Sequence, residues 1–300
     1  MTGGPQSYST GVTFVLLSTL GWSLSGIFVR LMPGLDGWQI NCWRGYWMAA
    51  AMLCYLVVSY GSALPARFRA IPAGALYSSA LCFAVGTTFY VTSLTLASTA
   101  TVSVIGATSP LFAGLLSPWL THERPSALAW AAALIALGGS AVIGWNGLET
   151  GRWLGILTSF GIPTTFALQT VLLRRYRHLD MMPSLFLGGV FSFLGAGLLG
   201  FTAGHAGGGF EIDGRSLLLL AAMGPLQLAL PLIFYARGAR SIPAIALSLI
   251  AMLDAVLNPF WPWLFLDERP EAAAFLGGGI ILGAVLLSIL GGRWLARTET

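Results

Sequence analysis

Ten long apolar runs constrain this chain more than any other feature of its sequence. Each run holds about twenty mostly apolar residues, the length that an α-helix needs to cross a bilayer. The spans of a membrane β-barrel would be only about ten residues long, with alternating polarity. The predicted spans are 10–31, 38–60, 71–96, 99–120, 126–145, 152–173, 182–203, 215–237, 241–265 and 271–292.

The composition argues against a soluble protein. Only 9% of the residues are charged and 56% are hydrophobic, and the mean hydropathy is +0.79. A soluble domain carries about 25% charged residues, and a disordered chain combines low hydrophobicity with many charges. The first run has no basic flank and no small-residue cleavage site, so we expect a retained helix rather than a signal peptide. We predict an all-α, multi-pass protein whose surroundings are a lipid bilayer.

The arginines are distributed unevenly between alternate loops, which predicts the orientation. Cytoplasmic loops of membrane proteins are rich in basic residues, and the richer side here also holds both termini, so both termini are expected to be cytoplasmic. The net charge of +4 does not indicate nucleic-acid binding, because the arginines are scattered between apolar stretches. The richer side carries Arg67, Arg69, Arg124, Arg174, Arg175, Arg177, Arg237, Arg240, Arg293 and Arg297, and the other carries Arg30, Arg152, Arg215 and Arg269.

Two halves of the sequence match at a constant spacing of 145 residues. Residues 89–144 align with 234–289 without a gap, and we place the halves at 1–145 and 146–300. Each half holds five spans, an odd number, so the second half enters the membrane from the opposite side. Secondary transporters with such inverted repeats bind their substrate near the midplane. The matches include Phe89-Tyr90 with Phe234-Tyr235, Ser103 with Ser248, Arg30 with Arg175, and Glu123-Arg124-Pro125 with Glu268-Arg269-Pro270.

The stretch TSLTLASTATVSVIGATSPLFAGLLSPWLTHERPSALAWAAALIALGGSAVIG resembles the hallmark region of the drug/metabolite transporter superfamily, in its ten-helix EamA-type branch. In that family, span four has a proline in its middle and a glutamate at its end, and span five bears a glycine. Pro110, Glu123 and Gly138 match these positions. The opening GWSLSGIFVRL and Arg44 in span two are similar to the family as well. The second half departs from the pattern in span nine, where Asp254-Ala255 stands at the family's frequent acid-proline pair.

The resemblance implies two inverted five-helix bundles around a central cavity, with spans five and ten at the periphery. Family members move amino acids, other metabolites and amphipathic cations. This chain is most similar to bacterial inner-membrane exporters of aromatic and other hydrophobic amino acids. The residues themselves indicate only a small, partly apolar solute.

Two ionisable residues, Arg44 and Asp254, lie well within the predicted spans. A charge inside a bilayer costs about 2.5–3.5 kcal/mol on insertion scales, so each needs a partner or a function. Asn258 follows Asp254 by one turn and shares its helical face. Either the two charges hold the ends of a zwitterionic solute, or Asp254 carries a coupling proton. A structural alternative is that Arg44 and Asp254 pair with each other, or with backbone exposed at proline breaks, and lock the bundle.

Other polar and aromatic residues complete the predicted substrate site. Gln227 lies between Pro225 and Pro231, where span eight is expected to bend beside the cavity, although an interhelical hydrogen bond explains it equally well. Gln169 is expected to be structural, as are Glu123 and Glu268, which we interpret as caps or corner salt bridges. The remaining candidates are Trp22, Ser25, Trp43 and Trp47 as an aromatic wall, the repeat-matched Tyr90 and Tyr235, which line the cavity or pack, and Pro110.

Rival functions find less support. A membrane enzyme needs a nucleophile–base pair or a metal site, but His122, His178 and His205 lie in separate loops, and the sequence has no H-E-x-x-H or G-x-S-x-G motif. We therefore expect no enzyme activity, no metal and no cofactor. A channel-like or receptor role remains as an alternative, although the repeat favours alternating access. Glycine steps such as Gly279 and Gly283 fit internal helix packing, and also a homodimer.

Overall fold

The computed structural model describes residues 7–96, 99–145, 153–202, 212–258, 260–266 and 272–298. These residues form ten helical spans and no strand, with the short helix α4 (Leu64–Ala70) between spans 2 and 3. The predicted runs agree with the observed spans to within a few residues at most ends. Spans 1 to 5 are α1 (Tyr8–Trp22) with α2 (Ser25–Arg30), α3 (Gly37–Tyr60), α5 (Ala73–Leu96), α6 (Thr99–Gly106) with α7 (Ser109–Leu120), and α8 (Ala127–Gly144). Spans 6 to 10 are α9 (Trp153–Ser159) with α10 (Gly161–Arg175), α11 (Met182–Thr202), α12 (Gly214–Met223) with the π-helical segment η3 (Gly224–Ala229) and α13 (Leu230–Gly238), α14 (Ala244–Ala251) with α15 (Asp254–Leu257) and α16 (Phe260–Leu266), and α17 (Ala272–Thr298).

Polar residues at the span ends fix where several helices begin. The Asp36 carboxylate accepts the Gln39 N–H at 2.8 Å, and the Gln39 side chain accepts the Asp36 N–H, which makes a capping box at the start of α3. Ser126 caps α8 and Asp213 caps α12 in the same manner, with side-chain oxygens that accept backbone N–H groups. Within the described ranges, seven helical stretches are long and apolar enough by themselves to cross a membrane.

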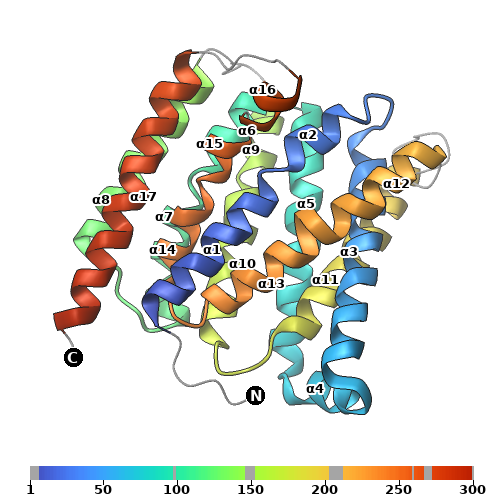
Figure 1. Cartoon of the computed structure of the whole chain (residues 1–300), viewed down its shortest axis with the longest axis horizontal. Helices are drawn as coiled ribbons and strands as arrows, with labels where there is room; N and C mark the ends of the chain where they lie inside the picture. Colours follow the sequence, from blue (N-terminus) through green and yellow to red (C-terminus); the bar gives the residue numbers. More distant parts are fainter. Residues whose placement is uncertain are drawn as a thin grey trace.

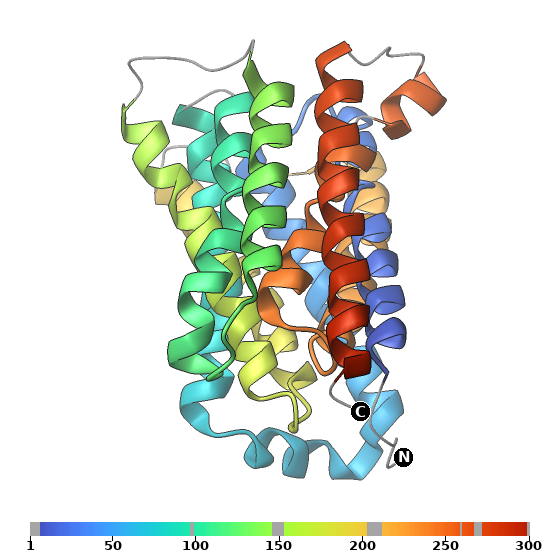
Figure 2. The same ribbon diagram turned by 90° about the vertical axis from the view of Figure 1, so that its left-hand side faces the viewer.

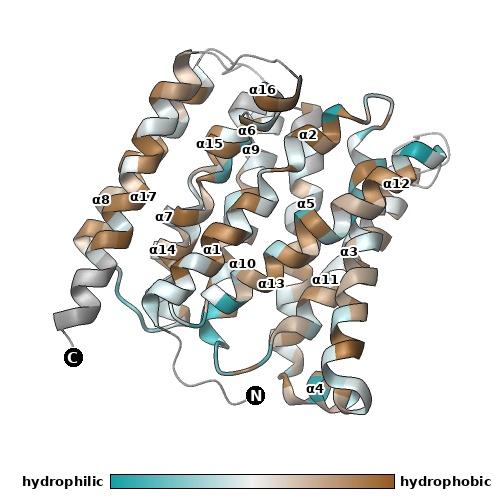
Figure 3. Ribbon diagram, viewed as in Figure 1, coloured by the Kyte–Doolittle hydropathy of each residue, from teal (hydrophilic) through white to brown (hydrophobic). Residues whose placement is uncertain are grey.

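The spans form one bundle whose helices run between two ends (Figures 1 and 2). We call the end where α1 begins and α17 ends the termini end, and the other the far end. Strongly hydrophilic colour is found mostly towards the two ends of the bundle, and white to brown prevails along the spans (Figure 3). Many large hydrophobic side chains on the spans are exposed, among them Val58, Leu115 and Leu276. The surface between the ends therefore suits the interior of a bilayer.

Spans 5 and 10 stand side by side at one edge of the bundle, which confirms the peripheral position implied by the family resemblance (Figure 1). Their backbones meet at Gly139 and Gly277: a Cβ on Gly139 would lie 2.7 Å from the Gly277 carbonyl oxygen, and a Cβ on Gly277 would overlap the Gly139 carbonyl oxygen. The internal packing role expected of Gly279 and Gly283 is wrong, because a Cβ on either would find no described atom within 4 Å. The close approach uses Gly277, which is two residues before Gly279 and therefore on the opposite side of the helix.

Spans 4 and 9 break at equivalent positions of the two repeats. The break at 107–108 separates α6 from α7, and the break at 252–253, 145 residues later, separates α14 from α15. Pro110 accounts for the first break, because it lacks an N–H and disfavours helix at the preceding residue. No proline stands at the second break. The repeat therefore extends from the sequence to the irregular backbone at the centre of the bundle.

Some predicted features lie outside the described residues. They are the second corner Glu268-Arg269-Pro270, Arg152 and His205.

Candidate functional site

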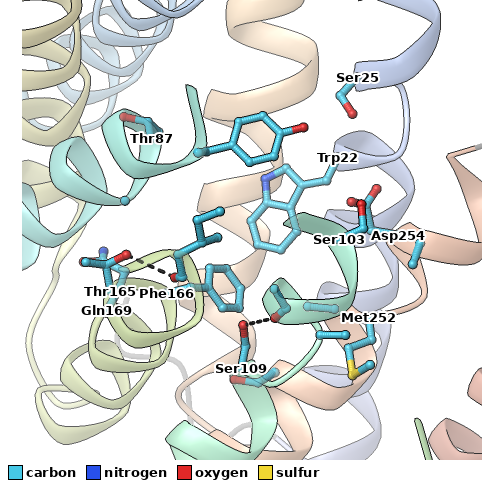
Figure 4. Close-up of a pocket in the computed structure, with 18 of the residues that line it drawn as sticks. Trp22, Ser25, Thr87, Ser103, Ser109, Thr165, Phe166, Gln169, Met252 and Asp254 are labelled. Atoms are coloured by element: carbon cyan, nitrogen blue, oxygen red, sulfur yellow. Dashed lines mark hydrogen bonds between the residues drawn. The ribbon is translucent and has the colours of Figure 1, made fainter. Parts of the chain in front are cut away.

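A central cavity of about 390 Å³ lies among spans 1, 2, 3, 4, 6, 8 and 9. This volume is within the range of pockets for small molecules. Its wall combines aromatic rings with hydroxyl, amide and charged groups, and Figure 4 labels ten of the residues around the space. The cavity therefore fits the central position implied by the inverted repeat.

The two repeats contribute equivalent residues to this wall. In spans 4 and 9, four pairs separated by 145 residues line the cavity, with two residues before each helix break and two at or after it. Because spans 4 and 9 break at the same register, the same positions reach the cavity from both halves. The pairs are Ser103 with Ser248, Gly106 with Ala251, Ala107 with Met252, and Ser109 with Asp254.

Asp254 brings a carboxylate into the cavity wall at the first residue of α15. Its Oδ1 is buried and accepts no hydrogen bond from any residue that the structure describes. A buried polar atom without a partner is unfavourable unless a ligand or water supplies one. The atom is therefore available to a donor group of a solute.

Arg44 brings the opposite charge to the same cavity from α3. Its Nη2 donates to Asn41 Oδ1 at 2.9 Å, and its buried Nε has no partner within the described ranges. Both residues are described, and no ion pair joins Arg44 to Asp254. The interpretation that these two residues hold the bundle together by pairing is therefore wrong for this conformation. Tyr90, which also lines the cavity, is near enough to both charges to interact electrostatically with each.

Asn258 and Gln227 hold the broken part of span 1 against the second half. Asn258 Oδ1 accepts the Gly26 N–H at 3.0 Å, and its Nδ2 donates to Ser25 Oγ at 3.1 Å. Gln227 Nε2 donates to the Trp22 carbonyl oxygen at 3.4 Å, while its Oε1 is buried without a described partner. Gln227 belongs to η3, so the expected irregularity of span 8 is confirmed, as a π-helical segment.

Two aromatic rings, backed by a third, form the wall on the termini side of the cavity. Trp22 and Phe166 line the space, and Tyr235 packs behind them with its ring centroid 5.0 Å from Trp22 and 5.7 Å from Phe166. Tyr235 is 1% exposed, and its hydroxyl shares a hydrogen bond of 2.8 Å with Thr170 Oγ1. Beyond these rings every residue of α14 is buried, so the packing is closed towards the termini end.

The cavity is more accessible from the far end. Tyr90 is 42% exposed, and the side chains of Ser25, Asp254 and Asn258 are only partly buried. The packing is therefore tighter on the termini side of the cavity than on the far side.

Seven of the predicted site residues line the cavity, and four do not. Trp43 and Trp47 pack beside α12, because they share one side of α3 and Arg44 projects towards another. Tyr235 lies behind Trp22, and Pro110 is buried within span 4 at the start of α7. The cavity-lining seven are Trp22, Ser25, Arg44, Tyr90, Gln227, Asp254 and Asn258.

Several cavity residues were not expected from the sequence. Gln169, which we expected to be structural, does donate from Nε2 to Ser79 Oγ at 3.1 Å, but it also lines the cavity. The repeat could have indicated Ser103 and Ser109 as cavity residues. Ser103 matches Ser248, and Ser109 is the repeat equivalent of Asp254. Thr87, Thr165 and Phe166 gave no comparable signal, because apolar runs do not specify how a helix is rotated.

Glu123 closes a corner at the termini end rather than the cavity. Its Oε1 accepts Arg174 Nε at 2.7 Å, and Arg177 lies 3.5 Å away. Arg174 also donates to the Ala239 carbonyl oxygen at 3.1 Å, which ties span 6 to the end of span 8. For Glu123 the predicted corner salt bridge is confirmed, and its partners are Arg174 of span 6 and Arg177 directly after that span.

The arrangement is suited to binding. The described residues contain no group of three or more His, Cys, Asp or Glu that would hold a metal ion. The cavity offers an anion, a cation, neutral hydrogen-bonding groups and aromatic faces, which are means of recognising a small amphipathic solute.

Comparison with known proteins agrees with this architecture. The model of the EamA-like transporter family matches residues 9–145 and, a second time, residues 153–290. One solved structure, described only as "Crystal structure of protein", superposes with a TM-score of 0.81 and 17% sequence identity, covering 96% of this chain and 99% of that chain. At this identity the likeness concerns the fold alone. No curated protein matches the sequence significantly.

The family model covers most of the chain in two copies, and the structure is an all-α membrane protein of two inverted five-helix repeats around a central cavity. The chain belongs to the EamA-like transporter family of the drug/metabolite transporter superfamily, whose members are multi-pass membrane transporters of small molecules.

Proposed function

We propose that this protein exports hydrophobic and aromatic amino acids across a bacterial inner membrane by alternating access. The observation that carries the proposal is that Asp254 and Arg44 line the same cavity, each with a buried polar atom that no described residue satisfies. A zwitterionic solute supplies an ammonium group for the carboxylate and a carboxylate for the guanidinium. The resemblance to amino acid exporters supports the direction of transport.

The aromatic wall supports an apolar side chain on the solute. Trp22 and Phe166 line the cavity beside the two charged residues, with ring centroids 6.0 Å apart. Aromatic rings provide large apolar contact areas and favour edge-to-face partners. A solute with a zwitterionic head and an aromatic or branched side chain therefore matches both parts of the wall.

The experiment compares three solutes that differ only in their charged ends. Proteoliposomes with the purified chain are assayed for movement of labelled phenylalanine, phenethylamine, which lacks the carboxylate, and 3-phenylpropionate, which lacks the ammonium group. We expect phenylalanine to move without ATP, and much faster than either analogue. Faster movement of phenethylamine would indicate that the substrate is an amphipathic cation instead of an amino acid. A site that used the Asp254 carboxylate without Arg44 would show this preference. Movement of none of them above empty liposomes would reject the substrate class.

Two variants connect the assay to the cavity. Arg44→Gln should reduce the advantage of phenylalanine over phenethylamine, because it removes the partner of the carboxylate. Asp213→Asn is the control for a change of charge, because Asp213 caps α12 and does not line the cavity. This variant should keep the selectivity of the parent. An unchanged selectivity in Arg44→Gln would contradict the assigned role of the guanidinium.

A further inference from the structure

The Tyr235–Thr170 hydrogen bond has a counterpart across the repeat. Subtracting 145 from each number gives Tyr90 and Ser25, so a tyrosine matches a tyrosine and a hydroxyl residue matches a hydroxyl residue. The same spacing relates spans 1 and 6 from end to end, because Tyr8–Arg30 and Trp153–Arg175 both cover 23 residues. Each half therefore carries the same two groups, near opposite ends of the bundle.

The two pairs are in different states in this structure. Tyr235 and Thr170 are buried, at 1% and 0% exposure, and share a hydrogen bond of 2.8 Å on the termini side of the cavity. Tyr90 is 42% exposed, and no hydrogen bond joins it to Ser25, although both are described and both line the cavity. Ser25 Oγ accepts Asn258 Nδ2 at 3.1 Å, and a hydroxyl oxygen has a second lone pair for another donor.

We propose that the two pairs are reciprocal gates: Tyr235–Thr170 holds the termini end shut in this conformation, and Tyr90–Ser25 forms the matching hydrogen bond that shuts the far end in the opposite conformation. Exchange of conformation between inverted repeats gives each repeat the packing that the other had. The contact made by one pair must then be broken when its counterpart forms. Tyr235 and Tyr90 are thus positioning residues that set the balance between the two states.

The gates differ in what stands behind them. Beyond Tyr235–Thr170, Arg174 donates to the Ala239 carbonyl oxygen and pairs with Glu123, so the termini end is closed by two layers. The second layer is a corner of the bundle outside the cavity, whereas Tyr235 packs directly on the cavity residue Trp22. Movement of a solute against Trp22 therefore acts first on the tyrosine gate.

The test measures which face of the membrane has access to the cavity. The chain has three cysteines, and Cys82 is the one that lines the cavity. In a Cys42→Ala/Cys54→Ala background, a membrane-impermeant maleimide added to spheroplasts or to inverted vesicles reports access to Cys82 from each face. The parent should be labelled mainly from the face at the far end.

Removal of one hydroxyl should shift the balance in a direction that depends on the gate. A net hydrogen bond changes a two-state ratio by roughly fivefold. Tyr235→Phe should lower the far-face to termini-face labelling ratio by about that factor, Tyr90→Phe should raise it by the same factor, and the double variant should return near the parent. Tyr77→Phe is the matched control, since Tyr77 lies on α5 and is 55% exposed. If the two variants shifted the labelling ratio in the same direction, or not at all, the proposal would be overturned. A purely structural role for the tyrosines does not predict shifts in opposite directions.

Cross-linking provides a second measurement if a phenylalanine variant folds poorly. In a cysteine-free background, a short bifunctional thiol cross-linker should bridge Thr170→Cys to Tyr235→Cys and Ser25→Cys to Tyr90→Cys. A cross-linker is used because a contact through a tyrosine hydroxyl leaves the two Cβ atoms too far apart for a direct disulfide. A protein with all four cysteines should be bridged at one pair or the other in a single molecule. Bridges at both pairs in one molecule, or none between 25 and 90, would also overturn it. The inference rests on the alternating access of the proposed function. The labelling assay needs no substrate, so it tests the gates independently of the substrate class. Opposed shifts without phenylalanine transport would therefore reject the substrate class and leave the gates standing.

Discussion

Asp254 occupies the place in the second repeat that Ser109 occupies in the first. Each is the first residue of a half-helix after a two-residue break, and each lines the central cavity. Ser109 satisfies its hydroxyl locally by donating to the Gly106 carbonyl oxygen at 2.5 Å, whereas Asp254 Oδ1 has no described partner. The two repeats therefore place equivalent positions at the cavity, but only the second repeat supplies a carboxylate there. The electrostatic character of the two sides of the cavity therefore differs.

Asp254→Asn should nearly abolish transport while the protein stays folded. A hydrogen bond to a charged group contributes about 1.5–3 kcal/mol, which corresponds to a loss of roughly 10- to 100-fold in affinity. Stability should not fall, because no described side chain depends on the carboxylate. The assay measures transport and thermal unfolding on one preparation, with Ser109→Ala as the matched control. Normal transport would mean that Asp254 is incidental, and a lowered unfolding temperature would make it a structural residue.

Asn258→Ala should lower stability, because it removes two hydrogen bonds that hold the break in span 1. The Gly26 N–H and the Ser25 hydroxyl lose their partner, which costs about 1–2 kcal/mol in the free energy of unfolding. Thermal unfolding in detergent measures the loss. Thr13→Ala on span 1 serves as the control, because the Thr13 hydroxyl donates only to the Ser9 carbonyl oxygen within its own exposed turn. Equal stability of the two variants would show that the bridge to span 1 contributes nothing.

Much of the fold follows from the sequence because a bilayer fixes the length of each span. The ten apolar runs give ten helices, and the spacing of 145 residues gives the matched breaks of spans 4 and 9. The scarcity of charge inside the spans identifies Asp254 and Arg44 as cavity residues. The assignment of their substrate, the division at residue 145 and a homodimer stay predictions.

The orientation of individual side chains was harder to predict. Neighbouring helix positions point about 100° apart, so Trp43 packs on α12 although Arg44 beside it lines the cavity. An apolar run does not give this rotation, because almost every face of such a helix is apolar. The π-helical segment at Gly224–Ala229 adds a further local rotation, and the sequence indicated only that span 8 would be irregular there.

Gly224→Ala should destabilise the protein, whereas Gly279→Ala should not. A Cβ on Gly224 would lie 2.5 Å from Trp47 Cβ and 2.7 Å from the Met48 nitrogen, so the π-helical segment must move away from α3. Overpacking of this kind costs about 1–3 kcal/mol. A Cβ on Gly279 meets nothing within 4 Å, and alanine favours helix over glycine. Unfolding midpoints in detergent compare the two, and equal midpoints would contradict the packing.

Both termini should lie on the cytoplasmic side of the membrane. The richer set of arginines includes Arg67 and Arg69 on α4, which lies at the termini end of the bundle (Figure 1), and positively charged loops remain in the cytoplasm. Reporter fusions after Thr300 and within 61–72 should be active on the cytoplasmic side, and a fusion within 31–36 on the opposite side. A reporter after Thr300 that is exported would reverse the predicted orientation.

Glu123→Gln should loosen the termini end and leave the cavity wall unchanged. The Arg174 side chain is 8% exposed and loses its anionic partner, while Glu123 is 28% exposed. Loss of one partner from a fully buried pair costs about 3–5 kcal/mol, and because Glu123 is partly solvated we expect about 2 kcal/mol. Arg177→Gln is the matched control: its side chain is 49% exposed and its contact of 3.5 Å is longer, so its loss should be small. Thermal unfolding gives the stability, and phenylalanine affinity gives the state of the cavity. Equal losses of stability in both variants would show that burial of Arg174 does not determine the strength of this corner, and a large change in affinity with normal stability would place Glu123 in the binding site.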